Sequence, residues 1–187
     1  MNETKRLVLG ALLISISLVL GFTGWGFIPL PLPILAGTIF HIPVILAGIL
    51  LGPGYGFLTG CVFGIFAVQQ FPAFPWFVLF PGRPLIGLAA SGGFLLLSRW
   101  DKSKIIAVVT ASVLGSLTNS VITLGLGSFF KVLAPELTIW ENVKIAFTFS
   151  PVVLTEAALA VILVPAIYSA WKAYAHHGLP QKPLRKE

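Results

Sequence analysis

The chain has 187 residues, of which 57% are hydrophobic and 10% are charged, and its mean hydropathy is +0.97. A soluble domain carries about 25% charged residues, so this composition excludes an ordinary soluble domain and predicts an integral membrane protein with one domain. The formal net charge of +6 does not predict nucleic-acid binding, because the basic residues lie in short segments between apolar runs. The single cysteine, Cys61, excludes an intramolecular disulfide and offers no metal-ligand spacing. We expect no metal and no cofactor.

Six apolar runs along the chain predict six membrane-spanning helices. Their approximate bounds are 7–22, 35–51, 53–68, 84–98, 105–130 and 143–171. Several runs are close to the shortest length that crosses a bilayer, which is about 17–25 residues. The predicted fold class is an all-α membrane protein, a compact six-transmembrane-helix bundle that occupies residues 1–187.

The first run follows Lys5 and Arg6, as the apolar part of a signal peptide would. No small-x-small cleavage site follows it, so we expect a retained first span. Small residues lie four apart in this span, at Ala11 and Ser15. Such spacing usually serves packing inside the bundle. If the two residues face outward instead, they offer a docking strip for another membrane subunit.

The loop at 24–34 is rich in proline and aromatic residues and has no charge. Two interpretations of Trp25 and the other aromatic residues of the outer loops stay open. They form an aromatic belt at the level of the lipid headgroups, or they form a lid over a pocket.

The second and third runs form one glycine-rich stretch. Its glycines recur every fourth residue, at Gly48, Gly52, Gly56, Gly60 and Gly64, and Pro53 interrupts the stretch in its middle. This pattern predicts two helices joined by a very tight turn. Glycines four apart lie on one helix face, where a neighbouring backbone approaches closely, as is typical of helices packed in lipid.

Basic residues are unevenly distributed between the two expected faces. One face carries Lys5, Arg6, Arg99, Lys102, Lys104, Lys172, Lys182, Arg185 and Lys186, and the other carries only Arg83, Lys131 and Lys144. Six spans put both termini on the same side. The positive-inside rule then predicts that both termini are cytoplasmic.

A few polar side chains fall inside the expected spans. Glu156, Asn119 and His41 lie in the middle or outer half of the bundle, and Arg83 lies nearer its outer mouth. A carboxylate at the centre of a spanning helix costs roughly 2.5–3.5 kcal/mol, so it usually faces the bundle interior or a cavity. We expect a pocket open to the outside, lined by Glu156 and Asn119. The alternatives are hydrogen bonds among these residues, a structural role for His41, and an interfacial anchor at Arg83.

Motifs of common catalytic sites are missing from the sequence. It has no Walker A motif, no HExxH, no GxSxG and no CxxC. We therefore expect that the chain is not an enzyme and does not power transport by itself.

The chain resembles a known family over nearly its whole length, and four segments carry the resemblance. They are HIPVILAGILLGPGYGFLTGCVFGIF at 41–66, PGRPLIG at 81–87, GSLTNSVITLGLG at 115–127 and TEAALAVILVPAI at 155–167. In their order and spacing they resemble the S component, the substrate-binding subunit, of energy-coupling factor (ECF) vitamin transporters. The resemblance implies a six-helix protein in the prokaryotic cell membrane with both termini cytoplasmic.

The resemblance also implies a mechanism. An S component binds a vitamin in an outward-facing pocket closed by the first loop, then associates with a membrane T subunit and two cytoplasmic ATPases. ATP hydrolysis drives release of the vitamin inside. In the family, a small-xxx-small motif on the first helix contacts the T subunit, and Ala11 and Ser15 match it, with serine where alanine is typical. Glu156, Asn119, His41, Arg83 and Trp25 are the residues that we expect to bind substrate.

Two substrate types agree with these residues. Arg83 suits the carboxylate of a pantothenate-like vitamin, and the aromatic loops suit stacking on a flat ring such as that of riboflavin. Other functions stay open: a stand-alone transporter or channel, an assembly protein, and an intramembrane enzyme. The enzyme would need Glu156 and His41 within about 3 Å of a common point.

Overall fold

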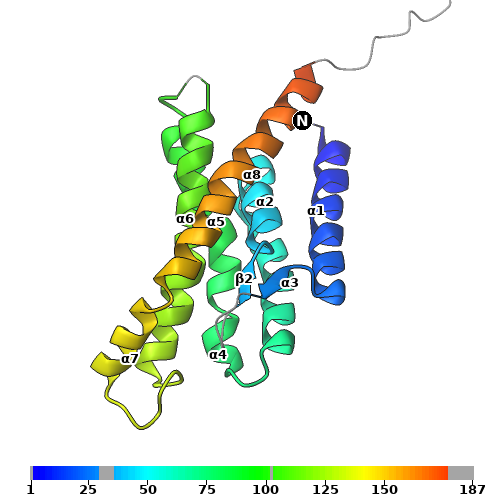
Figure 1. The fold of residues 1–187 in the computed structure, drawn as a ribbon. Helices are drawn as coiled ribbons and strands as arrows, with labels where there is room; N and C mark the ends of the chain where they lie inside the picture. Colours follow the sequence, from blue (N-terminus) through cyan, green and yellow to red (C-terminus); the bar gives the residue numbers. More distant parts are fainter. Residues whose placement is uncertain (1, 30–35, 102, 177–187) are drawn as a thin grey trace, which may run out of the picture.

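The structure is a computed structural model that describes residues 2–29, 36–101 and 103–176. In the described residues, helices form a single bundle, and two short strands form a hairpin beside the C-terminal end of α1 (Figure 1). The elements are α1 (Glu3–Thr23), β1 (Phe27–Pro29), β2 (Ala36–Thr38), α2 (His41–Leu51), α3 (Pro53–Gln70), α4 (Trp76–Leu79), α5 (Gly82–Leu97), α6 (Ile105–Phe129), α7 (Ile139–Phe147) and α8 (Ser150–His176).

Four stretches of the described chain are long and apolar enough to cross a membrane. They are Glu3–Thr23, Trp76–Leu97, Ile105–Phe129 and Ser150–Tyr174, and His41–Leu51 is a shorter apolar helix. The molecule is therefore a mainly helical membrane protein, as the composition predicted.

The second span differs from the sequence prediction of 35–51. Helix α2 begins only at His41, because residues 36–38 pair as strand β2 with β1, antiparallel, with Phe27 opposite Thr38. The backbone groups of β2 therefore bond to another strand rather than to a helical turn. At 1.5 Å per residue, the eleven residues of α2 extend over ~16 Å, about half of a bilayer core.

The predicted span at 143–171 is divided into two helices. α7 ends at Phe147 and α8 starts at Ser150, with Pro151 in its first turn. Proline is tolerated in the first turn of a helix but clashes with the preceding turn inside one, so Pro151 favours a new start. α7 has its own N-terminal capping box between Thr138 and Glu141, and the hydrogen bond from the Thr138 backbone N–H lowers the pKa of the Glu141 carboxyl.

Glycines bring the backbones of α2, α3 and α5 into direct contact, as their spacing predicted for α2 and α3. A methyl group added at Gly56 would lie 2.9 Å from the Cα atoms of both Gly48 and Gly87. Between α2 and α3, Gly52 has φ +98°, which favours glycine and permits the tight turn.

The two ends of the bundle differ in what they carry. The start of α1, the α5–α6 connector and the end of α8 lie at one end, whereas α4 and α7 lie at the other (Figure 1). The β-hairpin lies between them, level with the C-terminal end of α1. Two contacts support this grouping. Arg6 Nη2 donates to the carbonyl of Leu51 at 2.9 Å, and Lys172 Nζ donates to the carbonyl of Ser103 at 3.3 Å.

Candidate functional site

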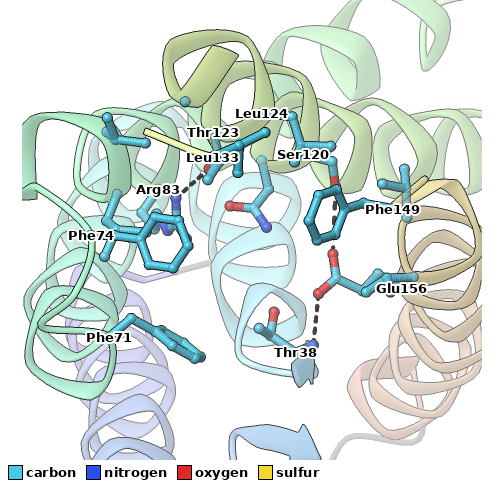
Figure 2. A pocket seen from close by; sticks show the side chains of 16 residues that line it. Thr38, Phe71, Phe74, Arg83, Ser120, Thr123, Leu124, Leu133, Phe149 and Glu156 are labelled. Atoms are coloured by element: carbon cyan, nitrogen blue, oxygen red, sulfur yellow. Dashed lines mark hydrogen bonds between the residues drawn. The ribbon is translucent and has the colours of Figure 1, made fainter. Parts of the chain in front are cut away.

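A cavity of about 130 Å³ opens near the end of the bundle that holds α4 and α7 (Figure 2). Segments far apart in the sequence form its walls, from β2 to the first turns of α8. The lining residues are Thr38, Phe71, Phe74, Val78, Leu79, Arg83, Asn119, Ser120, Thr123, Leu124, Gly127, Leu133, Phe149, Val152, Val153 and Glu156. Mostly apolar walls with a few convergent polar groups are typical of a small-molecule site.

Glu156 supplies the carboxylate of the cavity. It projects from α8 and is 5% exposed. Its Oε1 accepts a hydrogen bond from the backbone N–H of Thr38 at 2.7 Å, and its Oε2 accepts a long one from Ser120 Oγ at 3.5 Å. Strand β2 and helix α6 therefore fix the orientation of the carboxylate, and a carboxylate has further lone pairs for other donors.

Arg83 supplies the positive charge. It lies in the first turn of α5, is 6% exposed, and donates through Nη1 to Thr123 Oγ1 on α6. Its guanidinium carbon lies 5.4 Å from the centre of the Phe63 ring, a distance suited to a cation–π contact. Its Nε atom has no hydrogen-bond partner among the described residues. The side chain is thus held in place, while its Nε–H group remains as a hydrogen-bond donor for a ligand.

Asn119 contributes an amide to the same cavity. It lies on α6, is 5% exposed, and its Oδ1 atom has no hydrogen-bond partner within the described chain. A buried polar atom without a partner costs about 1–3 kcal/mol. An atom in this state at a cavity wall is a ready contact for a ligand.

The two charged groups lie on different sides of the cavity. In Figure 2, Arg83 lies beside Thr123, and Glu156 lies beside Ser120 and Thr38. In the described part of the chain, the hydrogen bonds of these two side chains go to other residues and not to each other.

His41 lies behind the cavity and does not line it. The side chain is fully buried, with Nε2 3.3 Å from the carbonyl oxygen of Glu156 and Nδ1 3.4 Å from Thr38 Oγ1. Since the carbonyl can only accept, Nε2 carries the proton and Nδ1 accepts from the threonine hydroxyl. His41 therefore ties the hairpin to α8. The ring contacts the backbone of Glu156 rather than its carboxylate, and only Glu156 of the two lines the cavity.

Trp25 also lies away from the cavity lining. The indole is 79% exposed, so it is not a cavity residue in this structure. Residues 30–34 of the predicted lid at 24–34 lie outside the described residues. Two other aromatic residues of the outer loops, Phe71 and Phe74, do line the cavity.

Three polar residues that line the cavity were not predicted from the sequence: Thr38, Ser120 and Thr123. Helical spacing could have indicated Thr123, which lies four residues after Asn119 and therefore on the same face of the helix. For Ser120 the only signal was its position next to Asn119. Nothing in the sequence marked Thr38, whose contact with Glu156 joins positions 118 residues apart.

Ala11 and Ser15 are both exposed on α1. The residues of this helix that are buried are Gly10, Leu13 and Ser17. The two small residues therefore belong to the outward face of α1, the placement that the docking interpretation requires.

Comparison with protein families supplies the remaining observation. The family model described as "ECF transporter, substrate-specific component" matches residues 5–168, which is most of the chain. The chain belongs to this family. No curated protein matches it. This ECF substrate-specific component is thus a substrate-binding membrane subunit of a transport system, and its family implies a small-molecule substrate and partnership with T and ATPase modules.

Proposed function

We propose that this ECF substrate-specific component captures a water-soluble vitamin in the cavity and hands it to an ATP-driven module of one T subunit and two ATPases. The observation that carries the proposal is the convergence of Glu156, Asn119 and Arg83. Each is more than nine-tenths buried, each comes from a different helix, and all three line one cavity. The vitamin is pantothenate-like or riboflavin-like.

The proposed topology has six crossings, made by α1, β2 with α2, α3, α4 with α5, α6, and α8, in the prokaryotic cell membrane. The ends of α1 and α8 that carry Arg6 and Lys172 share one end of the bundle with the α5–α6 connector, which carries Arg99 and Lys104. The positive-inside rule favours the cytoplasm for that end. The cavity lies toward the opposite end, so the substrate enters from outside.

Uptake measurements in cells test the transfer step. We would express the chain alone, with the T subunit and both ATPases, and with ATPases whose Walker A lysine is replaced, in cells that lack their own uptake of the labelled vitamin. We expect uptake only with the intact module, because this chain has no nucleotide-binding motif of its own. Equal uptake by the chain alone would reject the ATP-driven transfer and identify a stand-alone transporter.

A further inference from the structure

The guanidinium of Arg83 lacks a counter-ion among its direct contacts. It is 6% exposed, and its described partners are the hydroxyl of Thr123 and the face of Phe63. Arginine has five N–H donors, and Nε has no partner within the described residues. Burial of a charge is costly unless the charge is paired and hydrogen-bonded. A ligand anion at this wall would supply both, and a carboxylate fits the planar fork of the guanidinium with two parallel hydrogen bonds.

The wall formed by Glu156 suits a hydrogen-bond donor of a ligand rather than an anion. An ionised carboxylate only accepts hydrogen bonds, and Glu156 receives one at 2.7 Å from Thr38 and a long one at 3.5 Å from Ser120. A hydroxyl or amine of a ligand would complete its hydrogen bonding. A ligand carboxylate at this wall would instead be repelled by the like charge.

Helix α6 links these two walls. Ser120 contacts Glu156, and Thr123, one turn further on, contacts Arg83. Asn119, on the same stretch of α6, adds an amide whose Oδ1 atom has no partner in the described chain. The cavity therefore has a positive group at one side, a negative group at the other, and a neutral polar group on the helix that bridges them.

We infer that the substrate is a small carboxylate whose carboxyl group binds Arg83 and whose far end presents a hydroxyl or amine to Glu156. This inference rests on the proposed function and selects between its two substrate types. A neutral flat ring system such as riboflavin has no carboxylate and would leave Arg83 without an anion. A hydroxy acid such as pantothenate satisfies both walls, and its central amide can donate to Asn119.

The test begins with calorimetric titration of the purified full-length protein with six vitamins. Pantothenate and biotin carry a carboxylate and a distant N–H or O–H donor, whereas nicotinate carries a carboxylate without such a donor. Riboflavin, pyridoxine and thiamine carry no carboxylate. We expect binding by a member of the first pair. Binding only by a vitamin outside that pair would overturn the inference and leave the proposed function standing, whereas binding by no vitamin would reject both.

The second step compares the bound acid with a neutral analogue, such as panthenol for pantothenate or the primary amide for biotin. Hydrogen bonds to charged groups are worth about 1.5–3 kcal/mol, so we expect the neutral analogue to bind roughly tenfold to a hundredfold more weakly. Arg83→Gln should reduce the affinity for the acid to that for the analogue. An unchanged ratio of the two affinities in Arg83→Gln would overturn the inference.

Two further variants test the inference even if Arg83→Gln fails to fold. Arg83→Lys keeps the charge but not the planar fork, so it should keep a preference for the acid at lower affinity. Glu156→Gln should weaken the binding of the acid and of the neutral analogue by the same factor, so the ratio of their two affinities should stay unchanged. Suppose instead that Glu156→Gln loses the preference for the acid and both Arg83 variants keep it. The ligand carboxylate would then bind at the wall of Glu156, and the inference would be overturned.

Discussion

His41 illustrates how a buried polar residue positions a group of the candidate site without lining the cavity. Its ring joins the hydroxyl of Thr38 to the carbonyl of Glu156, and the backbone N–H of Thr38 in turn binds the Glu156 carboxylate. These contacts connect the hairpin and the start of α2 to α8. The position of the carboxylate in the cavity therefore depends on a histidine that does not line the cavity.

We predict that His41→Leu destabilises the fold and weakens ligand binding together. Loss of the ring leaves the Glu156 carbonyl and the Thr38 hydroxyl without this partner, at a cost of roughly 1–3 kcal/mol in the free energy of unfolding. Thermal unfolding in detergent measures the first effect and ligand titration the second. Thr155→Val, which changes an exposed hydroxyl next to Glu156 on α8, is the control. A fully stable His41→Leu protein with unchanged affinity would contradict the positioning role.

At the scale of elements, close contact between α2, α3 and α5 sets the shape of the bundle beside the cavity. The contact depends on glycine because the atoms that a side chain would meet are backbone atoms, which cannot rotate away. Near Gly56, these are the Cα atoms of Gly48 and Gly87. Helix α5 also carries Arg83, which lines the cavity.

Gly56→Ala and Gly92→Ala should have opposite effects on stability. The new methyl group at position 56 would lie 2.9 Å from two Cα atoms, so the helices must separate, at a cost of roughly 1–3 kcal/mol. Nothing lies within 4 Å of a methyl group at position 92, where alanine gains up to about 1 kcal/mol in helix propensity. Thermal unfolding of both variants in one detergent checks this. Equal stability would show that the glycine contact does not determine packing.

At the scale of the whole molecule, the sequence was sufficient for the class and for three polar residues of the cavity lining, Glu156, Asn119 and Arg83. Apolar runs predicted a membrane protein, and the rarity of acids and amides inside them pointed to Glu156 and Asn119. The β1–β2 hairpin was not predicted, because each strand forms only by pairing with the other. Residues 36–38 are also continuous with the uncharged run that was predicted as the second span. The start of α8 had a signal, Pro151, which the continuous apolar pattern obscured.

Labelling of single cysteines tests the proposed orientation. In a Cys61→Ser background, Glu136→Cys lies in the α6–α7 connector near the cavity end, and Glu3→Cys lies at the start of α1. We predict that a membrane-impermeant maleimide labels Glu136→Cys in intact cells and labels Glu3→Cys only after lysis. The reverse pattern would place the cavity on the cytoplasmic side.

The outward face of α1 leads to a prediction about assembly. Ala11→Trp or Ser15→Trp should abolish uptake with the full module while vitamin binding by the isolated subunit stays unchanged, because both residues are exposed and away from the cavity. Ile16→Trp is the matched control, since Ile16 is also exposed but lies about 100° around the helix from Ser15. Normal uptake by both Ala11→Trp and Ser15→Trp would remove the docking role.

The most direct test of the binding site is calorimetric titration of the wild-type protein, Glu156→Gln, Asn119→Ala and Glu136→Gln with the vitamin panel. Glu136 is exposed and does not line the cavity, so it controls for loss of a carboxylate elsewhere. We predict saturable one-to-one binding of one vitamin to the wild type and to Glu136→Gln. Binding should be weakened roughly tenfold or more in the two cavity variants. Wild-type affinity in both folded cavity variants would contradict the assignment of this cavity as the substrate site.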